Sequence, residues 1–178
     1  EIENEKCVGI KSQNKKFESD CYVFALGNSS RDTVMMLADK IKMMNKPFAV
    51  GFRIEHPQKM IDFAQYKCDR DLPSATYQLS YSEENKRGVY TFCMCPGGYV
   101  INASSEENEL CVNGMSFHKR DGRNANSAIV CGIDENTYGH NLLDGIKFQQ
   151  EIERKAFELG GSNYNAPCLL YTSPSPRD

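Results

Sequence analysis

The chain has 178 residues, a formal net charge of −3 and 40% hydrophobic residues. Its length allows one or two domains, and its composition is that of an ordinary soluble globular protein. The acidic balance provides no basic surface for nucleic acid, and no apolar run reaches the roughly 20 residues that a membrane span needs. We therefore expect neither a nucleic-acid partner nor a membrane partner.

Both ends of the chain have unusual sequences. The first residues, EIENEKCVGI, lack the basic and apolar regions of a secretory signal. The last residues, CLLYTSPSPRD (168–178), match a translated sequencing adapter, and we exclude them from fold reasoning as a non-native tail. We expect an internal fragment, whose partners are the missing N- and C-terminal segments of the same protein.

The cysteines favour a reducing compartment. Of the eight cysteines, the seven outside the tail are scattered and lie mostly in apolar runs. Such a set is typical of reduced thiols that pack as small hydrophobic side chains, not of a disulfide framework. We therefore expect a cytoplasmic protein.

The N-terminal part predicts two strands followed by one helix. Residues 7–11 and 20–26 are β-rich, and the second run is so apolar that we expect a strand buried on both faces of a parallel sheet. Residues 30–44 repeat apolar side chains at helical spacing. Ser29 followed by Asp32 resembles a capping box at the start of this helix.

The remainder predicts a β-rich unit with flanking helices. Short β-rich runs predict its strands, and two amphipathic runs predict its helices. The expected strands cover residues 47–57, 77–82, 88–95, 99–103, 109–114 and 127–133, and the expected helices begin near Pro57 and cover residues 144–161. The predicted fold class is α+β, with the end of an α/β unit in residues 1–46 and a second domain in residues 47–167.

The segment DCYVFALGNSSRDT (20–33) is the first candidate site. A glycine lets a ligand lie against the backbone, and free N–H groups at a helix start favour a pyrophosphate. An ordinary strand-to-helix turn with a serine N-cap is the alternative. Taken alone, these residues favour that alternative, because one glycine is a weak signal.

CMCPGG (93–98) combines two thiols with a rigid turn. Pro96 fixes its own φ and keeps Cys95 extended, and Gly97–Gly98 could expose consecutive backbone N–H groups to an anion. The C-x-C spacing is too short for the usual zinc pair and lacks the C-x-x-C of a redox dithiol. A turn over a ligand, with Cys95 as a candidate thiol beside it, is the favoured interpretation.

Residues 113–130 are too polar for a core and too long for a hairpin loop. Functional residues concentrate on such loops. Arg120 and Arg123 could grip a phosphate or a carboxylate, and Asn124 and Asn126 could hydrogen-bond a ring edge. A merely solvated loop is the alternative.

Two further observations limit the site. Arg53 and Glu55 share a strand face and could form an ion pair, with a surface pair as the default. The chain lacks both G-x-G-x-x-G and G-x-x-x-x-G-K, so it cannot bind a nucleotide by itself through either motif.

Four stretches, in this order, resemble a family of bacterial, largely uncharacterised FAD-dependent dehydrogenases. They are FALGNSSRDT, KPFAVGFRIEHPQ, FCMCPGGYVINASSEENELCVNGMSFHKRDGRNANSAIV and LGGSNYNAP. The resemblance covers residues 1–167. It implies the C-terminal part of a Rossmann-like FAD-binding domain in residues 1–46 and an inserted substrate or cap domain in residues 47–167. The glycine fingerprint for the FAD pyrophosphate would then lie outside this chain.

The resemblance also implies roles for individual residues. Two turns, one after residues 20–26 and one in CMCPGG, would approach FAD, and the polar run after residue 113 would face the substrate. The implied cofactor-binding residues are Ala25, Gly27, Ser29, Arg31, Asp32, Cys95, Pro96, Gly97 and Gly98, and the implied substrate-binding residues are Arg120, Arg123, Asn124 and Asn126.

The function predicted from the sequence is hydride transfer by an FAD-dependent oxidoreductase on an unidentified small-molecule substrate. NAD(P)H is a candidate electron donor. The flavin would carry the chemistry, no metal is expected, and Cys95 is the one side chain considered for a catalytic part. The alternative is a non-enzymatic or metal-binding α+β module that uses Cys93, Cys95 and residues 113–127. We do not expect this fragment to be active alone.

Overall fold

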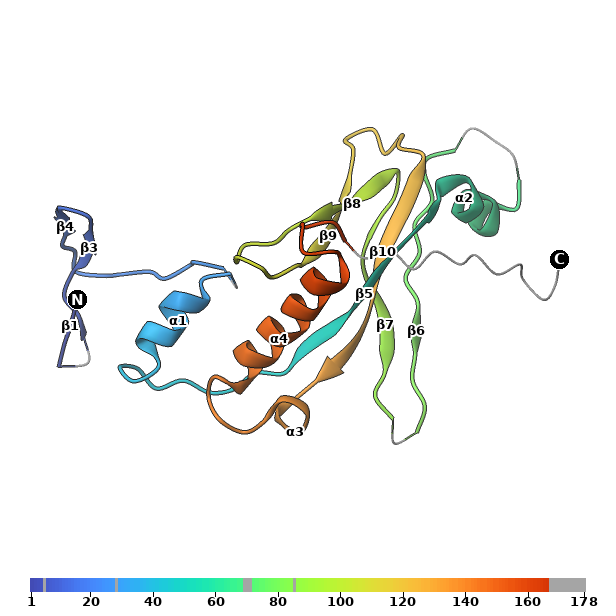
Figure 1. Cartoon of the computed structure of the whole chain (residues 1–178). Coiled ribbons are helices and arrows are strands. Elements are labelled where there is room, and N and C mark those ends of the chain that lie inside the picture. Colours follow the sequence, from blue (N-terminus) through green and yellow to red (C-terminus); the bar gives the residue numbers. More distant parts are fainter. Residues whose placement is uncertain (5, 28, 69–71, 85, 167–178) are drawn as a thin grey trace.

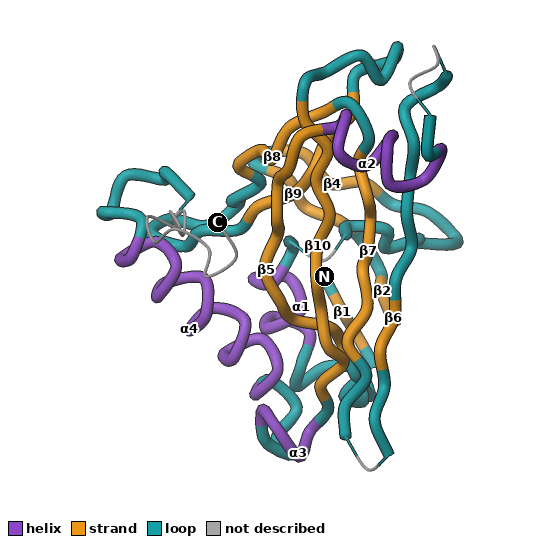
Figure 2. The backbone as a smooth tube through the Cα atoms, turned by 90° about the vertical axis from the view of Figure 1, so that its right-hand side faces the viewer, coloured by secondary structure: helices purple, strands orange, loops and turns teal. Residues whose placement is uncertain are grey.

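The computed structural model describes residues 1–4, 6–27, 29–68, 72–84 and 86–166 (Figure 1). Its largest unit is a four-stranded antiparallel sheet in the order β5-β10-β7-β6, whose strands lie side by side in Figure 2. β5 spans Phe48–Pro57, β6 spans Ser80–Tyr81, β7 spans Val89–Cys95 and β10 spans Asn124–Ile133. The predicted tail, residues 168–178, lies outside the described residues.

The centre of the sheet is the long pair of β5 and β10. Their register runs from Phe48 opposite Ile133 to Pro57 opposite Asn124. Both strands carry the β-branched residues that suit a pleated, half-buried surface. The pairing of β10 with β7 shifts between Asn126 and Ala128, where β7 has one extra residue. This β-bulge, at Cys93 and Met94, bends β7 at the start of CMCPGG.

A second hairpin packs against the sheet. β8 spans Gly98–Asn102 and pairs antiparallel with β9, which spans Val112–Ser116. The polar run of residues 113–130 is therefore a loop only in its middle, and the strands predicted over residues 109–114 and 127–133 overlap β9 and β10. Pairing with β8 holds residue 113 in a strand, and pairing with β5 starts β10 at residue 124. Only residues 117–123 connect the two strands.

Four helices accompany the strands among the described residues. α1 spans Arg31–Leu37, α2 spans Gln58–Tyr66, α3 spans Glu135–Tyr138 and α4 spans Asp144–Leu159. The predictions for α2 and α4 are confirmed. In Figures 1 and 2, α4 lies on the β5 side of the sheet and α2 lies near its upper end. None of the described helices is long and apolar enough to cross a membrane.

α1 is shorter than the predicted helix over residues 30–44. The side chains of Ile41 and Met44 are exposed, so no packing extends the helix past Leu37, and short helices depend on such packing. The predicted capping box is also wrong. Ser30 is the N-cap, and its hydroxyl donates to the carbonyl of Leu26 (2.8 Å).

The N-terminal arm consists of two small hairpins that lie beyond α1, away from the sheet (dark blue in Figure 1). β1 (Ile2–Glu3) pairs with β2 (Lys6–Cys7), and β3 (Ile10–Ser12) pairs with β4 (Lys15–Phe17). The predicted strand over residues 20–26 is wrong for this structure, because Val23 is 85% exposed and no described strand pairs with the segment. The α+β class is confirmed, whereas the Rossmann-like end is not.

The hydrophobic core is small. Among the described residues its buried side chains are Ala75, Cys95, Leu110, Ala125, Ile133 and Phe157. Cys95 and Ala125 come from the bulged end of the sheet. Leu110 and Phe157 lie where the segment before β9 meets α4, and the N–H of Leu110 donates to the carbonyl of Glu153 (2.9 Å). The best-buried part of the sheet is therefore the part that carries the predicted turn.

Candidate functional site

The turn between β7 and β8 is buried from Cys95 to Gly98. The N–H of Gly97 donates to the side-chain oxygen of Gln58 (2.8 Å), and the carbonyl of Gly97 accepts from the N–H of Gly122 (3.2 Å). Gln58 is itself buried, and its amide donates to Asp62 (2.7 Å) and to the carbonyl of Ala75 (3.0 Å). The Gly97 N–H is therefore already engaged inside the chain.

Glycine is required here because two backbones meet. Gly97 has φ +53, and a Cβ at this position would collide with the carbonyl of Arg120. A Cβ at Gly98 would collide with the carbonyl of Met115. The two glycines let the turn lie directly on β9 and on the 117–123 connection. This close approach explains the glycine pair without a ligand.

Next to the turn, Arg53 joins two of the predicted site segments. Asn126 lies opposite Cys95 in the sheet register. One guanidinium nitrogen of Arg53 donates to the side-chain oxygen of Asn126 and lies 3.8 Å from the Cys95 sulfur, and the other donates to the carbonyl of Cys93 (3.0 Å). Gly114 leaves the space that the guanidinium fills. CMCPGG (93–98) and the asparagine-rich segment at the start of β10 (124–127) are thus joined through Arg53 into one cluster.

The interior of this cluster is polar and closed. Asn126 and Ser127 are fully buried, and the Ser127 hydroxyl donates to the carbonyl of Ala128 (3.1 Å). The Asn126 Nδ2 atom is buried without a partner among the described residues. Burial raises the pKa of the Cys95 thiol, Cys93 adds to this shift and Arg53 opposes it. At neutral pH the Cys95 thiol is therefore protonated, which makes it a poor nucleophile.

The rim of the cluster is open and carries aromatic and basic side chains. Tyr99 and Phe117 are both exposed, and their rings meet edge to face with centroids 5.5 Å apart. Arg120 and Arg123 are exposed on the connection that follows Phe117. Asn124 donates to Glu55 (2.6 Å), whose other oxygen accepts from the N–H of Val100 (2.9 Å). Both Glu55 oxygens therefore accept hydrogen bonds from Asn124 and Val100, and the possible ion pair between Glu55 and Arg53 does not form.

The cofactor-binding residues predicted in the segment 20–33, apart from Arg31, make no described contact with this cluster. Ala25, Gly27 and Ser29 are exposed, and a Cβ at Gly27, which has φ +75, would meet nothing within 4 Å. The Asp32 side chain is exposed, and its oxygen accepts from the N–H of Thr33 (2.6 Å). Neither of the two cavities described below is lined by these residues or by the CMCPGG turn.

Arg31, predicted to face the cofactor, is buried in an ion-pair network. Its guanidinium donates to Glu109 (2.9 Å), to both oxygens of Glu153 (2.7 and 2.9 Å) and to Gln149 (3.2 Å). The hydrogen bond to Glu153 raises the pKa of Arg31 and burial opposes the shift. Arg154 also binds Glu109 (3.2 Å). In this chain Arg31 ties α1 to α4, and its charge is neutralised.

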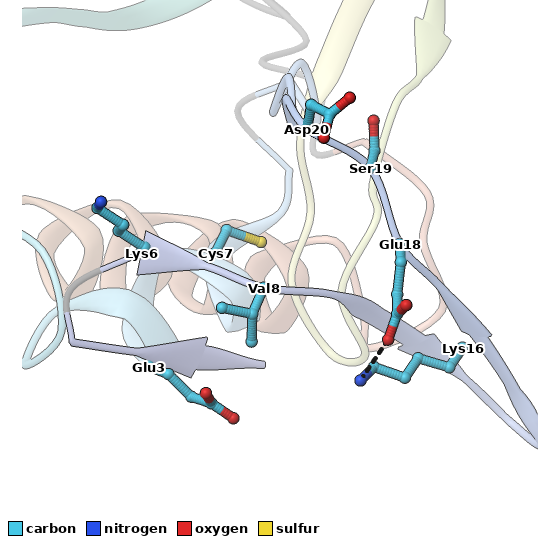
Figure 3. Close-up of a pocket in the computed structure, with 8 residues that line it drawn as sticks. All are labelled: Glu3, Lys6, Cys7, Val8, Lys16, Glu18, Ser19 and Asp20. Atoms are coloured by element: carbon cyan, nitrogen blue, oxygen red, sulfur yellow. Dashed lines mark ion pairs between the residues drawn. The ribbon is translucent and has the colours of Figure 1, made fainter.

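Two cavities among the described residues lie away from this cluster. The first is an open pocket on the N-terminal arm, lined mainly by charged residues that include the Lys16–Glu18 ion pair (2.7 Å; Figure 3). The second, of about 390 Å³, is mostly apolar and lies between α2 and the sheet. His56 and Tyr77 line the second cavity with ring centroids 5.6 Å apart, and burial lowers the pKa of His56. Neither cavity contains Gly27 or Gly97.

Sequence reasoning missed three parts of the cluster. Gln58 lies near the predicted start of a helix, and nothing in the sequence indicates that its side chain binds the turn. Tyr99 lies in a run typical of a half-buried strand and Phe117 lies in a polar run, so only the structure reveals that their exposed rings form a pair. No group of three or more His, Cys, Asp or Glu side chains able to hold a metal occurs among the described residues.

Comparison with known proteins identifies the class. Residues 47–173 match the family described as "FAD-dependent protein, C-terminal domain-like". The chain is thus part of an FAD-associated protein.

More specifically, the chain belongs to this FAD-dependent protein C-terminal domain-like family. It is 48% identical over 171 residues, 93% of its length, to an uncharacterised protein of Clostridium beijerinckii. The chain spans only 32% of the length of that curated relative. The family supports an association with FAD and does not favour the non-enzymatic or metal-binding alternative.

Proposed function

We propose that this chain supplies one wall of the flavin and substrate site of an FAD-dependent dehydrogenase. The observation that carries the proposal is the exposed Tyr99–Phe117 pair, because Phe117 begins the 117–123 connection that also carries the exposed Arg120 and Arg123. A flat aromatic ring stacks favourably on such side chains, and arginine binds phosphate or carboxylate groups. The family of the chain supports FAD as the flat ligand.

The interior of the cluster would position this rim. Because Gly97, Cys95 and Asn126 are buried and the Gly97 N–H is bonded to Gln58, a ligand would contact the outer side chains. The buried turn would hold the 117–123 connection in place. When bound, FAD would supply the hydride chemistry. NAD(P)H is the electron donor we propose, and Arg120, Arg123 and Asn124 would orient a small-molecule substrate of unknown identity.

The N-terminal segment would pack against the additional segments that the longer relative has. Residues 20–26 are apolar but exposed, with Val23 85% and Phe24 51% accessible. The longer relative has about three times the length of the aligned region. We propose that its additional segments provide neighbouring strands, so that residues 1–46 end a Rossmann-like FAD-binding domain. Ala25, Gly27, Ser29 and Asp32 would then be free to face the cofactor.

The test uses a protein that carries this chain together with the segments its longer relative has. It should purify with bound FAD that is released on denaturation. Phe117→Ala and Arg120→Ala should each weaken FAD or substrate binding by about tenfold, the loss expected for one stacking or charged contact. Tyr81→Ala and Lys86→Ala are matched controls, because both side chains are exposed and lie in or next to the β6–β7 hairpin, away from the rim. A colourless protein that also fails to bind added FAD would end the proposal.

A further inference from the structure

Asn113 and Gly114, in β9, form the only Asn-Gly pair in the sequence. The Asn113 side chain is exposed, and its oxygen accepts a hydrogen bond from the N–H of Gly114 (2.8 Å). This oxygen is bonded to Cγ, so the contact holds the Gly114 nitrogen beside the carbon of the side-chain amide. Glycine has no side chain to hinder the approach of the two groups. The pair therefore brings a nitrogen nucleophile next to an electrophilic carbon.

The pairing of β8 with β9 leaves the Gly114 N–H outside the hydrogen-bond ladder. In an antiparallel pair, opposite residues alternate between bonded and non-bonded pairs. The N–H of Ala103 donates to the carbonyl of Cys111 (2.9 Å), which identifies a bonded pair at one end of the hairpin. By the alternation, Asn113 belongs to a bonded pair, whereas Gly114, which is opposite Val100, does not. The Val100 N–H accordingly donates to a side chain of β5 instead (2.9 Å).

An amide N–H held in a ladder reacts only when the structure opens locally. The Gly114 N–H needs no such opening, because its described partner is the side chain with which it would react. We infer that Asn113 is a site of intramolecular deamidation in the folded chain, with the Gly114 nitrogen as the attacking group. The inference concerns the covalent chemistry of β9 and does not depend on flavin binding.

The reaction proceeds in two balanced steps. The Gly114 nitrogen gives its proton to a solvent base and attacks Cγ of Asn113. The bond from Cγ to Nδ2 breaks, Nδ2 takes up a proton and leaves as ammonia, and a succinimide ring remains. Water then adds to one of the two ring carbonyls, which opens the ring to aspartate or to isoaspartate. One water is consumed, one ammonia is released, and nothing is oxidised or reduced.

Isoaspartate would disturb β9 more than aspartate does. In isoaspartate the main chain runs through the side-chain carbon, so the strand gains one backbone atom before Gly114. A Cβ at Gly114 would already collide with the Arg53 guanidinium and with the Asn126 side chain. The strand therefore has no room on this side for the extra atom. Aspartate keeps the register of β9 and only places a charge on an exposed side chain.

Asn102, in β8, provides an internal comparison. Its side chain is also exposed, and a small residue, Ala103, follows it. The N–H of Ala103 is held by the carbonyl of Cys111, however, and Ala103 carries a methyl group. Attack on Asn102 therefore requires the ladder to open first. We expect Asn102 to stay intact while Asn113 reacts.

The experiment incubates the whole chain in mildly alkaline buffer, at a temperature where circular dichroism shows the fold intact. Trypsin then releases residues 88–119 as one peptide, because no Lys or Arg lies between Arg87 and Lys119. A sample digested before incubation gives the background. Fragmentation of the peptide assigns the gain of one mass unit to Asn102 or to Asn113. We expect Asn113 to convert faster by about tenfold or more, because the amide after Asn102 must first leave the ladder.

The products and two variants complete the test. A protease that cleaves before aspartate but not before isoaspartate should leave part of the converted peptide uncut at position 113. Asn113→Gln should abolish the conversion at this position, because the longer side chain would have to close a larger ring. Asn102→Gln is the matched control and should leave the conversion of Asn113 unchanged. The inference is overturned if Asn113 falls short of the expected margin over Asn102, or if aspartate is its sole product.

Discussion

Residues 1–46 and residues 47–166 differ in whether their apolar runs find partner strands. In the second region, β5 and β10 pair over ten residues each, and the apolar side chains of Ala125 and Ile133 in β10 are buried. In the first region, Val23 and Met44 are 85% and 84% exposed. An apolar run therefore becomes a strand only where a partner strand is available to satisfy its backbone. Four changes would break or sharpen this comparison.

The largest effect is expected at the buried turn of the second region. Gly97→Val would place a Cβ against the Arg120 carbonyl and force a branched residue to φ +53. Overpacking and backbone strain together should lower the free energy of unfolding by about 2–6 kcal/mol. Urea unfolding followed by circular dichroism measures the loss. Gly132→Val is the control, because a Cβ there meets nothing within 4 Å. Equal losses for both variants would contradict the role of the turn.

The contact between the two regions comes next. Arg31→Met would leave the buried Glu109 and the half-buried Glu153 without their shared cation, and Glu109 would keep only Arg154. Removing one partner of a buried ion pair costs about 3–5 kcal/mol, and the same urea titration would detect it. Lys147→Met removes an exposed ion pair with Asp144 (3.5 Å) and should cost less than about 1 kcal/mol. An Arg31→Met protein as stable as wild type would show that α1 is not held by this network.

A smaller effect is expected from pH at the apolar cavity. Burial lowers the pKa of His56 in the folded chain, so the unfolded chain binds a proton more readily at this position. Stability should therefore be complete above the ordinary histidine pKa of about 6.5 and should fall as the pH drops toward the folded value. Urea midpoints measured from about pH 7.5 to about pH 5 would show this slope. His56→Gln should flatten it, and an unchanged slope would assign the effect to other groups.

The smallest effect is expected in the first region. Val23→Ser should change the free energy of unfolding of this chain by less than about 0.5 kcal/mol, because the side chain is already in solvent. In a protein that also carries the additional segments of the longer relative, the same substitution should destabilise the fold by about 1–3 kcal/mol, as expected for burying a hydroxyl in a core. Thermal unfolding of both proteins makes the comparison. Equal and small shifts in both would rule out residues 20–26 as a buried strand.

Local patterns predicted the second region well and the first region poorly. The alternation in PFAVGFRIEHP and the helical spacing in residues 144–161 depend on neighbours that the chain itself supplies, and β5 and α4 formed close to the expected positions. The apolar run of residues 20–26 carries an equally strong pattern. It has no described partner strand, so its pattern alone could not make a strand.

The site was predictable as a set of segments but not as a set of contacts. The proximity of CMCPGG to the asparagine-rich run was expected, and the register places Cys95 opposite Asn126. The bond from Gly97 to Gln58 and the bridge from Arg53 to Cys93 depend on a one-residue bulge. A bulge changes which side chains share a face, and no residue in the sequence fixes its position.

The Arg31 network has a consequence for the integrity of the molecule. α1 is joined to the rest of the chain once by the peptide backbone through residues 38–47 and a second time by the guanidinium bound to Glu109 and Glu153. A protease that cuts in this exposed stretch, at Lys42 or Lys46, would therefore sever the covalent link while α1 stays in place. The two pieces should elute together until the carboxylates are protonated.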